Sequence, residues 1–177
     1  MDNTYSRRFA VVMGWVTLLS AVFGVVLSIL MWSHLEAFVV LTSDPIAAPY
    51  DLSHMSLSMR LIGGAVSLSG ALIGAYGLLK LRRTFLEASV GRALSLLSVM
   101  CFRRFAWVSL ILVVVGIVQS SLYGVIYSMS DVNSQNQLSV TFGSLEMGQL
   151  FSAVLLVFVA QVFAMGRQAE EDAAGII

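Results

Sequence analysis

The stretch KLRRTFLEASVGRALSLLSVMCFRRFAW (Lys80–Trp107) separates two long apolar segments and holds six of the ten basic residues of this chain. Five of these six gather near the two ends, Lys80, Arg82 and Arg83 at one and Arg103 and Arg104 at the other, and Arg92 lies between them. Lys and Arg accumulate in the cytoplasmic loops of membrane proteins, close to the ends of the spanning helices. The stretch therefore predicts a cytoplasmic loop between two membrane-spanning helices.

The composition of the whole chain agrees with this interpretation. Hydrophobic residues make up 58% of the 177 residues and charged residues only 11%, whereas a soluble domain has about 25% charged residues. A spanning helix needs about 20 mostly apolar residues, and four segments without Asp, Glu, Lys or Arg come close to this length: 9–32, 61–79, 105–127 and 147–165. These segments predict an all-α integral membrane four-helix bundle, a single domain over residues 1–177 with a short tail at 166–177.

The distribution of the basic residues predicts the orientation of the spans. Nine of the ten lie on the side of the opening stretch, which is also the side of both termini. The loops between the first two and the last two spans contain acidic residues and no Lys or Arg, apart from Arg60 at the outer end of the second span. We therefore expect both termini to be cytoplasmic.

Polar residues recur within the opening stretch itself. Thr84 and Glu87 have capping-box spacing, and Arg92, Ser95 and Ser98 follow one another at three-residue intervals among apolar side chains. This pattern predicts an amphipathic segment between the second and third spans. It fits a helix at the inner leaflet or an inward extension of the third span, and alternatively a docking surface for a cytoplasmic partner.

Small residues line the second span in two rows at four-residue spacing, one formed by Gly70 and Gly74 and the other by Gly63, Ser67, Ala71 and Ala75. Such rows let helix backbones approach closely in lipid, either within the bundle or at a homodimer face. Gln119, deep in the third span, is expected to hydrogen-bond to a neighbouring helix, with a ligand pocket as the alternative. The predicted packing residues are Gly63, Ser67, Gly70, Ala71, Gly74, Ala75 and Gln119.

No residue pattern indicates catalysis. There is no Gly-rich phosphate loop and no Ser-His-Asp order, and the spacing of His34 and His54 matches no zinc pattern. The spans contain no Asp, Glu or His at mid-membrane for a proton relay. We therefore predict a protein that is not an enzyme, with no catalytic residues, no cofactor, no metal and no direct contact with nucleic acid.

Two stretches carry a family resemblance. GRALSLLSVMCFRRFAW (91–107) and the tail FAMGRQAEEDAAGII (163–177) resemble the central motif and the ending of an uncharacterised bacterial four-span membrane family, domain of unknown function 2975. The matching positions are Gly91, Leu94, Ser95, Arg103, Arg104, Phe105 and Ala106 in the first stretch, and Gly166, Arg167, Glu170, Glu171, Asp172, Ile176 and Ile177 in the second. The resemblance implies four spans in a bacterial plasma (inner) membrane and no established activity.

Members of that family are often encoded beside small helix-turn-helix regulators, which favours a regulatory or accessory role. The predicted function is protein–protein interaction at the cytoplasmic face, where the acidic tail and the basic loop are expected to meet. The predicted partner-binding residues are Arg82, Arg83, Arg92, Arg103, Arg104, Glu170, Glu171 and Asp172. A structural subunit of a larger membrane complex and an intramembrane binder or carrier of an apolar small molecule stay open as alternatives. Expected partners are the lipid bilayer and a cytoplasmic or membrane protein, and self-association is left open.

Overall fold

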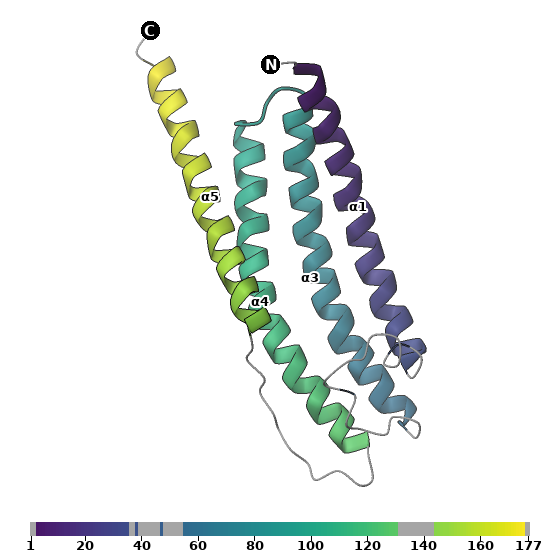
Figure 1. Ribbon diagram of the computed structural model, residues 1–177. Coiled ribbons are helices and arrows are strands. Elements are labelled where there is room, and N and C mark those ends of the chain that lie inside the picture. Colours follow the sequence, from purple (N-terminus) through teal and green to yellow (C-terminus); the bar gives the residue numbers. More distant parts are fainter. Residues whose placement is uncertain (1–2, 36–37, 39–46, 48–54, 131–143, 176–177) are drawn as a thin grey trace.

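The computed structural model describes residues 3–35, 38, 47, 55–130 and 144–175. Within these residues the chain forms four long helices (Figure 1), which are α1 (Asn3–Ser33), α3 (Leu57–Ser89), α4 (Leu96–Ser130) and α5 (Ser144–Ala174). Each helix includes a segment that is long and apolar enough to cross a membrane. The all-α fold and the four helices of spanning length are therefore confirmed. The two predicted outer loops lie largely outside the described residues.

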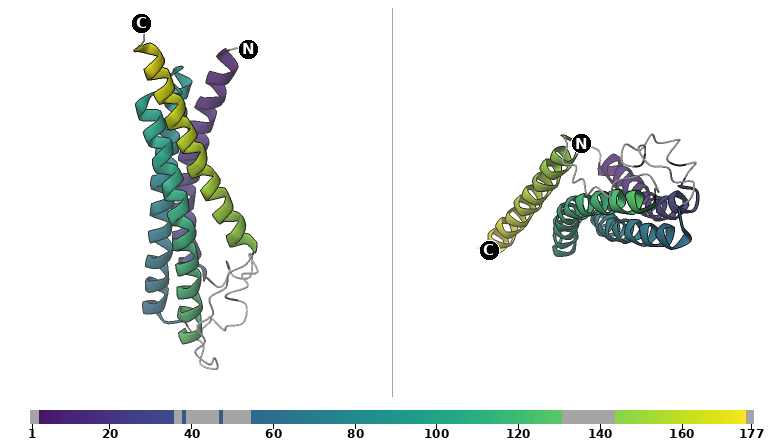
Figure 2. Two further views of the ribbon diagram at one scale, coloured as in Figure 1. Left: turned by 90° about the vertical axis from the view of Figure 1, so that its left-hand side faces the viewer. Right: turned by 90° about the horizontal axis from the view of Figure 1, so that it is seen from below.

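The helices pack in chain order. α1 packs on α3, α3 on α4 and α4 on α5, and within the described residues α1 and α5 do not contact each other. Figure 2 shows α5 crossing α4 at an angle, with its N-terminal end standing away from the other helices in the left view and its C-terminal end doing so in the view from below. The predicted four-helix bundle is therefore an open row of helices.

Both termini and the connection between α3 and α4 lie at the same end of the helices (Figure 1). α3 continues ten residues past the predicted span end at Leu79, and α4 begins nine residues before Phe105. No separate helix lies between α3 and α4: residues 96–104 of the predicted amphipathic segment form the first turns of α4, which agrees with the alternative of an extension of the third span, and residues 90–95 form a turn. Residues 80–89 are mostly good helix formers without Gly or Pro, so nothing ends α3 before Gly91.

A six-residue turn at 90–95, here called the α3–α4 turn, reverses the chain. Gly91 has φ +81°, its amide donates to the Ala88 carbonyl at 3.0 Å, and the amide of Arg92 donates to the Glu87 carbonyl at 3.0 Å. These two bonds form a Schellman motif, which requires the left-handed conformation that glycine adopts without strain.

Ser95 caps the helix that follows the turn. Its Oγ accepts from the amide of Ser98 at 3.1 Å, as an N-cap side chain does. Thr84 lies within α3, where its hydroxyl donates to the Ser98 carbonyl at 3.3 Å. The capping box predicted at Thr84 and Glu87 is therefore wrong, because the helix start that it would mark lies at Ser95.

The described aromatic core lies at the opposite end of the molecule. Trp32 of α1 is buried against α3 and α4. Its ring centroid lies 5.7 Å from that of Tyr123 and 6.2 Å from that of Tyr127. Leu35, Met55 and Ile126 are buried in the same cluster. The two ends of the helix row thus differ, because aromatic packing fixes one and the α3–α4 turn closes the other.

Glycines on α3 allow the close packing of its neighbours, but at a spacing different from the predicted one. The buried glycines are Gly63, Gly70 and Gly77, seven residues apart. A Cβ at Gly70 would lie 2.5 Å from Gln119 Nε2 and one at Gly77 would lie 2.8 Å from Val108 Cγ1, whereas Gly74 has room for a Cβ at 3.7 Å from Leu112. Gly70 is therefore a tight contact and its predicted partner Gly74 is not.

Polar side chains join the helices at two further points. The Gln119 amide donates to the Val66 carbonyl of α3, and Ser28 on α1 hydrogen-bonds to Ser67 on α3 at 2.7 Å. The predicted interhelical hydrogen bond of Gln119 is thus present. Ala71 and Ala75 are partly exposed on α3.

Candidate functional site

The α3–α4 turn is held by Glu87, at the end of α3. Its carboxylate accepts from Ser95 Oγ at 3.3 Å and lies 3.7 Å from the Arg92 Nε. The Arg92 side chain is 69% exposed while that of Glu87 is 21% exposed. One carboxylate therefore ties the turn together and orients a cation that remains accessible at its surface.

The C-terminal helix meets this turn through Arg167. One nitrogen of its guanidinium donates to the Leu94 carbonyl at 3.4 Å, and the other pairs with Glu171 one turn further along α5. Nearby, the ring centroids of Phe102 and Phe163 lie 5.3 Å apart. The tail and the loop therefore meet as predicted, but through a cation on a carbonyl group rather than through acidic residues on basic ones.

The predicted acidic residues of the tail are exposed. Glu170 and Asp172 lie on the surface of α5, and Glu171 pairs with Arg167 on its own helix. The last two residues of the family-like ending, Ile176 and Ile177, lie outside the described residues.

The predicted loop cations other than Arg92 lie on the helices below the turn. Gly77 packs against Val108 and Thr84 bonds to Ser98, so residues 80–83 of α3 lie level with residues 100–104 of α4. We call these cations the basic belt: Lys80, Arg82, Arg83, Arg103 and Arg104.

The members of the belt differ in their surroundings. Arg82 lies over the Trp15 ring of α1, with its guanidinium carbon 5.9 Å from the ring centroid, within cation–π range. Arg83, Arg103 and Arg104 are exposed. The structure thus brings the predicted basic residues together in one level across α3 and α4, separate from Arg92.

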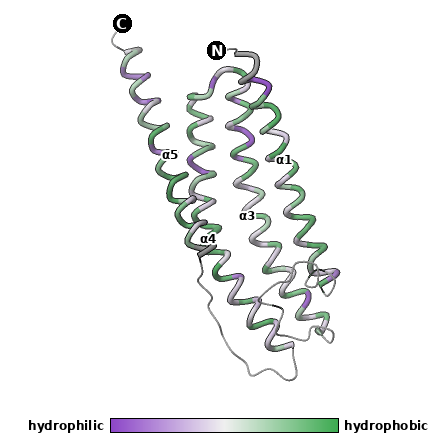
Figure 3. The backbone as a smooth tube through the Cα atoms, in the orientation of Figure 1, coloured by the Kyte–Doolittle hydropathy of each residue, from purple (hydrophilic) through white to green (hydrophobic). Residues whose placement is uncertain are grey.

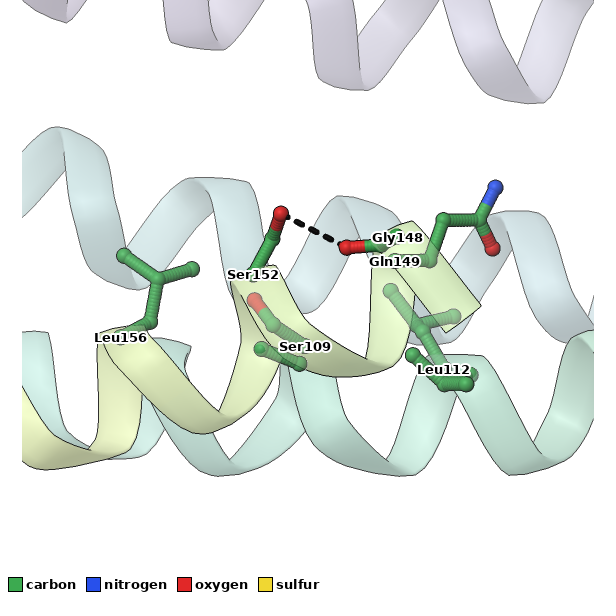
Figure 4. A pocket seen from close by; sticks show the side chains of 8 residues that line it. Ser109, Leu112, Gly148, Gln149, Ser152 and Leu156 are labelled. Atoms are coloured by element: carbon green, nitrogen blue, oxygen red, sulfur yellow. Dashed lines mark hydrogen bonds between the residues drawn. The ribbon is translucent and has the colours of Figure 1, made fainter. Parts of the chain in front are cut away.

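A groove lies between α4 and α5, apart from the turn end. It has a volume of about 550 Å³ and is lined by Ser109, Leu112, Val113, Gly148, Gln149, Ser152, Ala153 and Leu156. Its hydroxyls bond to their own helices, that of Ser152 to the Gly148 carbonyl at 2.8 Å and that of Ser109 to the Phe105 carbonyl at 3.0 Å. Figure 4 shows the amide of Gln149 directed away from Ser109. This groove therefore presents mainly apolar surface to a ligand.

Sequence reasoning missed three residues that build the turn end, namely Glu87 as its central acceptor, Ser95 as the helix cap and Arg167 as the link to α5. Arg167 and Glu171 do carry a signal, because an opposite-charge pair four residues apart is typical of a helix. In the part of the chain that the structure describes, no group of three or more His, Cys, Asp or Glu side chains is placed to hold a metal ion.

Comparison with protein-family models, with curated proteins and with solved structures gave no significant match. The resemblance to domain of unknown function 2975 therefore stays a prediction.

Proposed function

We propose that this chain is a regulatory or accessory membrane protein whose turn end faces the cytoplasm and binds a soluble protein partner. The observation that carries this proposal is the bond from Arg167 to the Leu94 carbonyl, which joins the C-terminal helix to the α3–α4 turn. A partner that contacts the turn also contacts the tail, so that its binding depends on both segments.

The chemistry of this surface favours a partner with acidic groups. Arg92 is the cation of the turn, and its ion pair with Glu87 is long, at 3.7 Å, and open to solvent on the side of the arginine. Exposed ion pairs contribute little stability, about 0–1 kcal/mol. A carboxylate of the partner can therefore replace Glu87 as the ion-pair partner of Arg92 at little cost in free energy. Glu87 keeps its hydrogen bond to Ser95 in that complex.

The test is recovery of the partner with the tagged full-length protein from native membranes in mild detergent. Arg92→Gln removes the cation, and we expect it to lower recovery severalfold at matched expression. Glu87→Gln is the matched control, since it breaks the same ion pair but keeps the cation. Equal recovery in the wild type and in Arg92→Gln would end the docking proposal, and equal losses in both variants would assign the effect to the shape of the turn.

The tail is tested separately through Arg167. Arg167→Gln removes both the bond to the Leu94 carbonyl and the pair with Glu171, and we expect it to reduce partner recovery because the surface loses one of its two segments. Glu171→Gln weakens only the pair within α5, so it should leave recovery close to that of the wild type. Recovery of a large membrane assembly instead of a soluble protein would favour the structural-subunit alternative.

A second candidate function is intramembrane binding of an apolar small molecule. The groove of about 550 Å³ between α4 and α5 favours it, since its walls are mostly aliphatic. Ser152→Phe would fill this groove from α5, and Ser20→Phe places the same bulk at an exposed position of α1. Mass spectrometry of co-purified small molecules should then show a loss only in Ser152→Phe. The same ligand content in both variants would exclude the groove.

A further inference from the structure

A groove of about 450 Å³ lies between α3 and α4 at the level of the basic belt. Its walls combine two cations, two aromatic rings and aliphatic surface, and the lining residues are Tyr76, Met100, Arg103, Arg104, Trp107 and Val108. Tyr76 and Trp107 are 46% and 48% exposed, so both rings stand at the rim. Lys80 adds a third cation, with Nζ 5.0 Å from the centroid of the Tyr76 ring.

The cations of this groove have no counter-charge from the described residues. Glu87 pairs with Arg92 and Glu171 pairs with Arg167, and none of the described carboxylates pairs with Lys80, Arg103 or Arg104. Like charges gathered in one site repel one another, and an anion bound among them relieves this repulsion. The charge of the groove therefore complements an anionic ligand.

The position of the basic belt along the helices, relative to the exposed apolar surface of α1, indicates which kind of anion can reach it. Arg82 lies level with Trp15, and α1 continues from Trp15 for six residues to Phe9 in the direction of the turn end. At 1.5 Å per residue this distance is about 9 Å. Phe9 and Val12 are both 57% exposed, and Figure 3 shows the hydrophilic part of α3 below the turn beside a mainly hydrophobic part of α1. The lipid-facing surface of α1 thus extends beyond the level of the arginines.

We propose that this groove binds the headgroup of an anionic phospholipid. The guanidinium groups of Arg103 and Arg104 are suited to phosphate oxygens, which they bind through charge-assisted hydrogen bonds. Trp107 and Tyr76 stand where interfacial aromatic rings meet the headgroup region, and the acyl chains lie along the aliphatic surface of α4 below Trp107. A basic pocket between spanning helices is a known setting for anionic headgroups.

The test uses purified full-length protein in detergent, titrated with phosphatidylglycerol and followed by native mass spectrometry. Phosphatidylcholine of the same chain length is the lipid control. The groove variant is Arg103→Gln with Arg104→Gln, and the matched control is Arg7→Gln with Arg8→Gln, which removes two exposed cations of the same end from outside both the groove and the basic belt. Each basic residue near anionic lipid is worth roughly a factor of five in affinity, so the groove variant should bind phosphatidylglycerol about 30-fold more weakly.

The control variant should bind phosphatidylglycerol with nearly the affinity of the wild type, and the wild type should bind phosphatidylcholine weakly. Equal losses in the two double variants would overturn the proposal, because they would assign the affinity to diffuse charge. Equal binding of the two lipids would overturn it as well, as would displacement of phosphatidylglycerol by an acidic peptide or by inorganic phosphate at similar concentration.

Two further variants separate binding from folding. Arg103→Lys with Arg104→Lys keeps the charge but loses the planar guanidinium fork, so its affinity should fall between those of the wild type and the Gln variant. If the Gln variant does not fold, Arg104→Gln alone should show a loss of about fivefold. The same affinity as the wild type in this single variant would count against the site.

Discussion

Replacement of Gly63 by alanine should destabilise the protein, whereas the same replacement at the neighbouring Gly64 should not. A Cβ atom at Gly63 would overlap the six-membered ring of Trp32, but one at Gly64 would lie 3.6 Å from the Trp32 Cβ, which is an ordinary contact. The Trp32 ring is buried against Tyr123 and Tyr127. The ring can therefore move away from an added methyl group only by disturbing these aromatic contacts.

The expected magnitude follows from three contributions. Both replacements gain about 1 kcal/mol of helix propensity, and this gain cancels when the two variants are compared. Overpacking of a filled site costs about 1–3 kcal/mol, and each aromatic contact that Trp32 loses costs about 0.5–1.5 kcal/mol. With one of the two aromatic contacts of Trp32 lost, Gly63→Ala should thus be less stable than Gly64→Ala by about 1.5–4.5 kcal/mol.

The assay is reversible unfolding of the purified protein in mild detergent, followed by tryptophan fluorescence and circular dichroism. Trp32→Phe, combined with Gly63→Ala, provides a double-mutant cycle. The smaller ring leaves room for the added methyl group, so the penalty of Gly63→Ala should shrink in that background. Equal stability of Gly63→Ala and Gly64→Ala, or an unchanged penalty beside Phe, would refute the packing argument.

Two further predictions concern the turn end. Gly91→Ala should cost roughly 1–2 kcal/mol of unfolding free energy because the residue has φ +81°, while Gly166→Ala, which meets no atom within 4 Å, should be neutral or stabilising by the same unfolding assay. In intact cells a membrane-impermeant thiol reagent should label Ser58→Cys at the far end of α3 but not Ala173→Cys in the tail. The native Cys101 is buried, so it should contribute little labelling of its own. Labelling of Ala173→Cys but not of Ser58→Cys would reverse the proposed orientation.

The sequence was sufficient to predict the four helices but not their ends. Uncharged apolar runs identify the spans because a charge within lipid is costly. The basic residues at 80–83 and 103–104 suggested that the helices stop there, yet Lys and Arg are good helix formers and do not interrupt a helix. The residue that ends α3 is Gly91, and its role depends on backbone geometry that a charge pattern does not contain.

Contacts between helices explain the other differences between the predictions from sequence and the structure. The spacing of Gly70 and Gly74 is typical of close helix packing, but only the neighbouring side chain decides which glycine is tight, and that neighbour is Gln119 for Gly70. Arg167 was visible as a basic residue of the tail. Its bond to the Leu94 carbonyl depends on the crossing of α5 over α4, which no local pattern specifies.

The open row of helices has a consequence for how the turn end works. α5 packs on α4 alone among the described helices, so a movement of its C-terminal part disrupts fewer contacts than a movement of α3, which is packed on both sides. Segments with few packing contacts open at the lowest free-energy cost. The bond from Arg167 to the Leu94 carbonyl and the contact of Phe163 with Phe102 hold this part of α5 beside the turn. A partner that binds the tail therefore acts on the least constrained helix, and the basic belt on α3 and α4 remains in place.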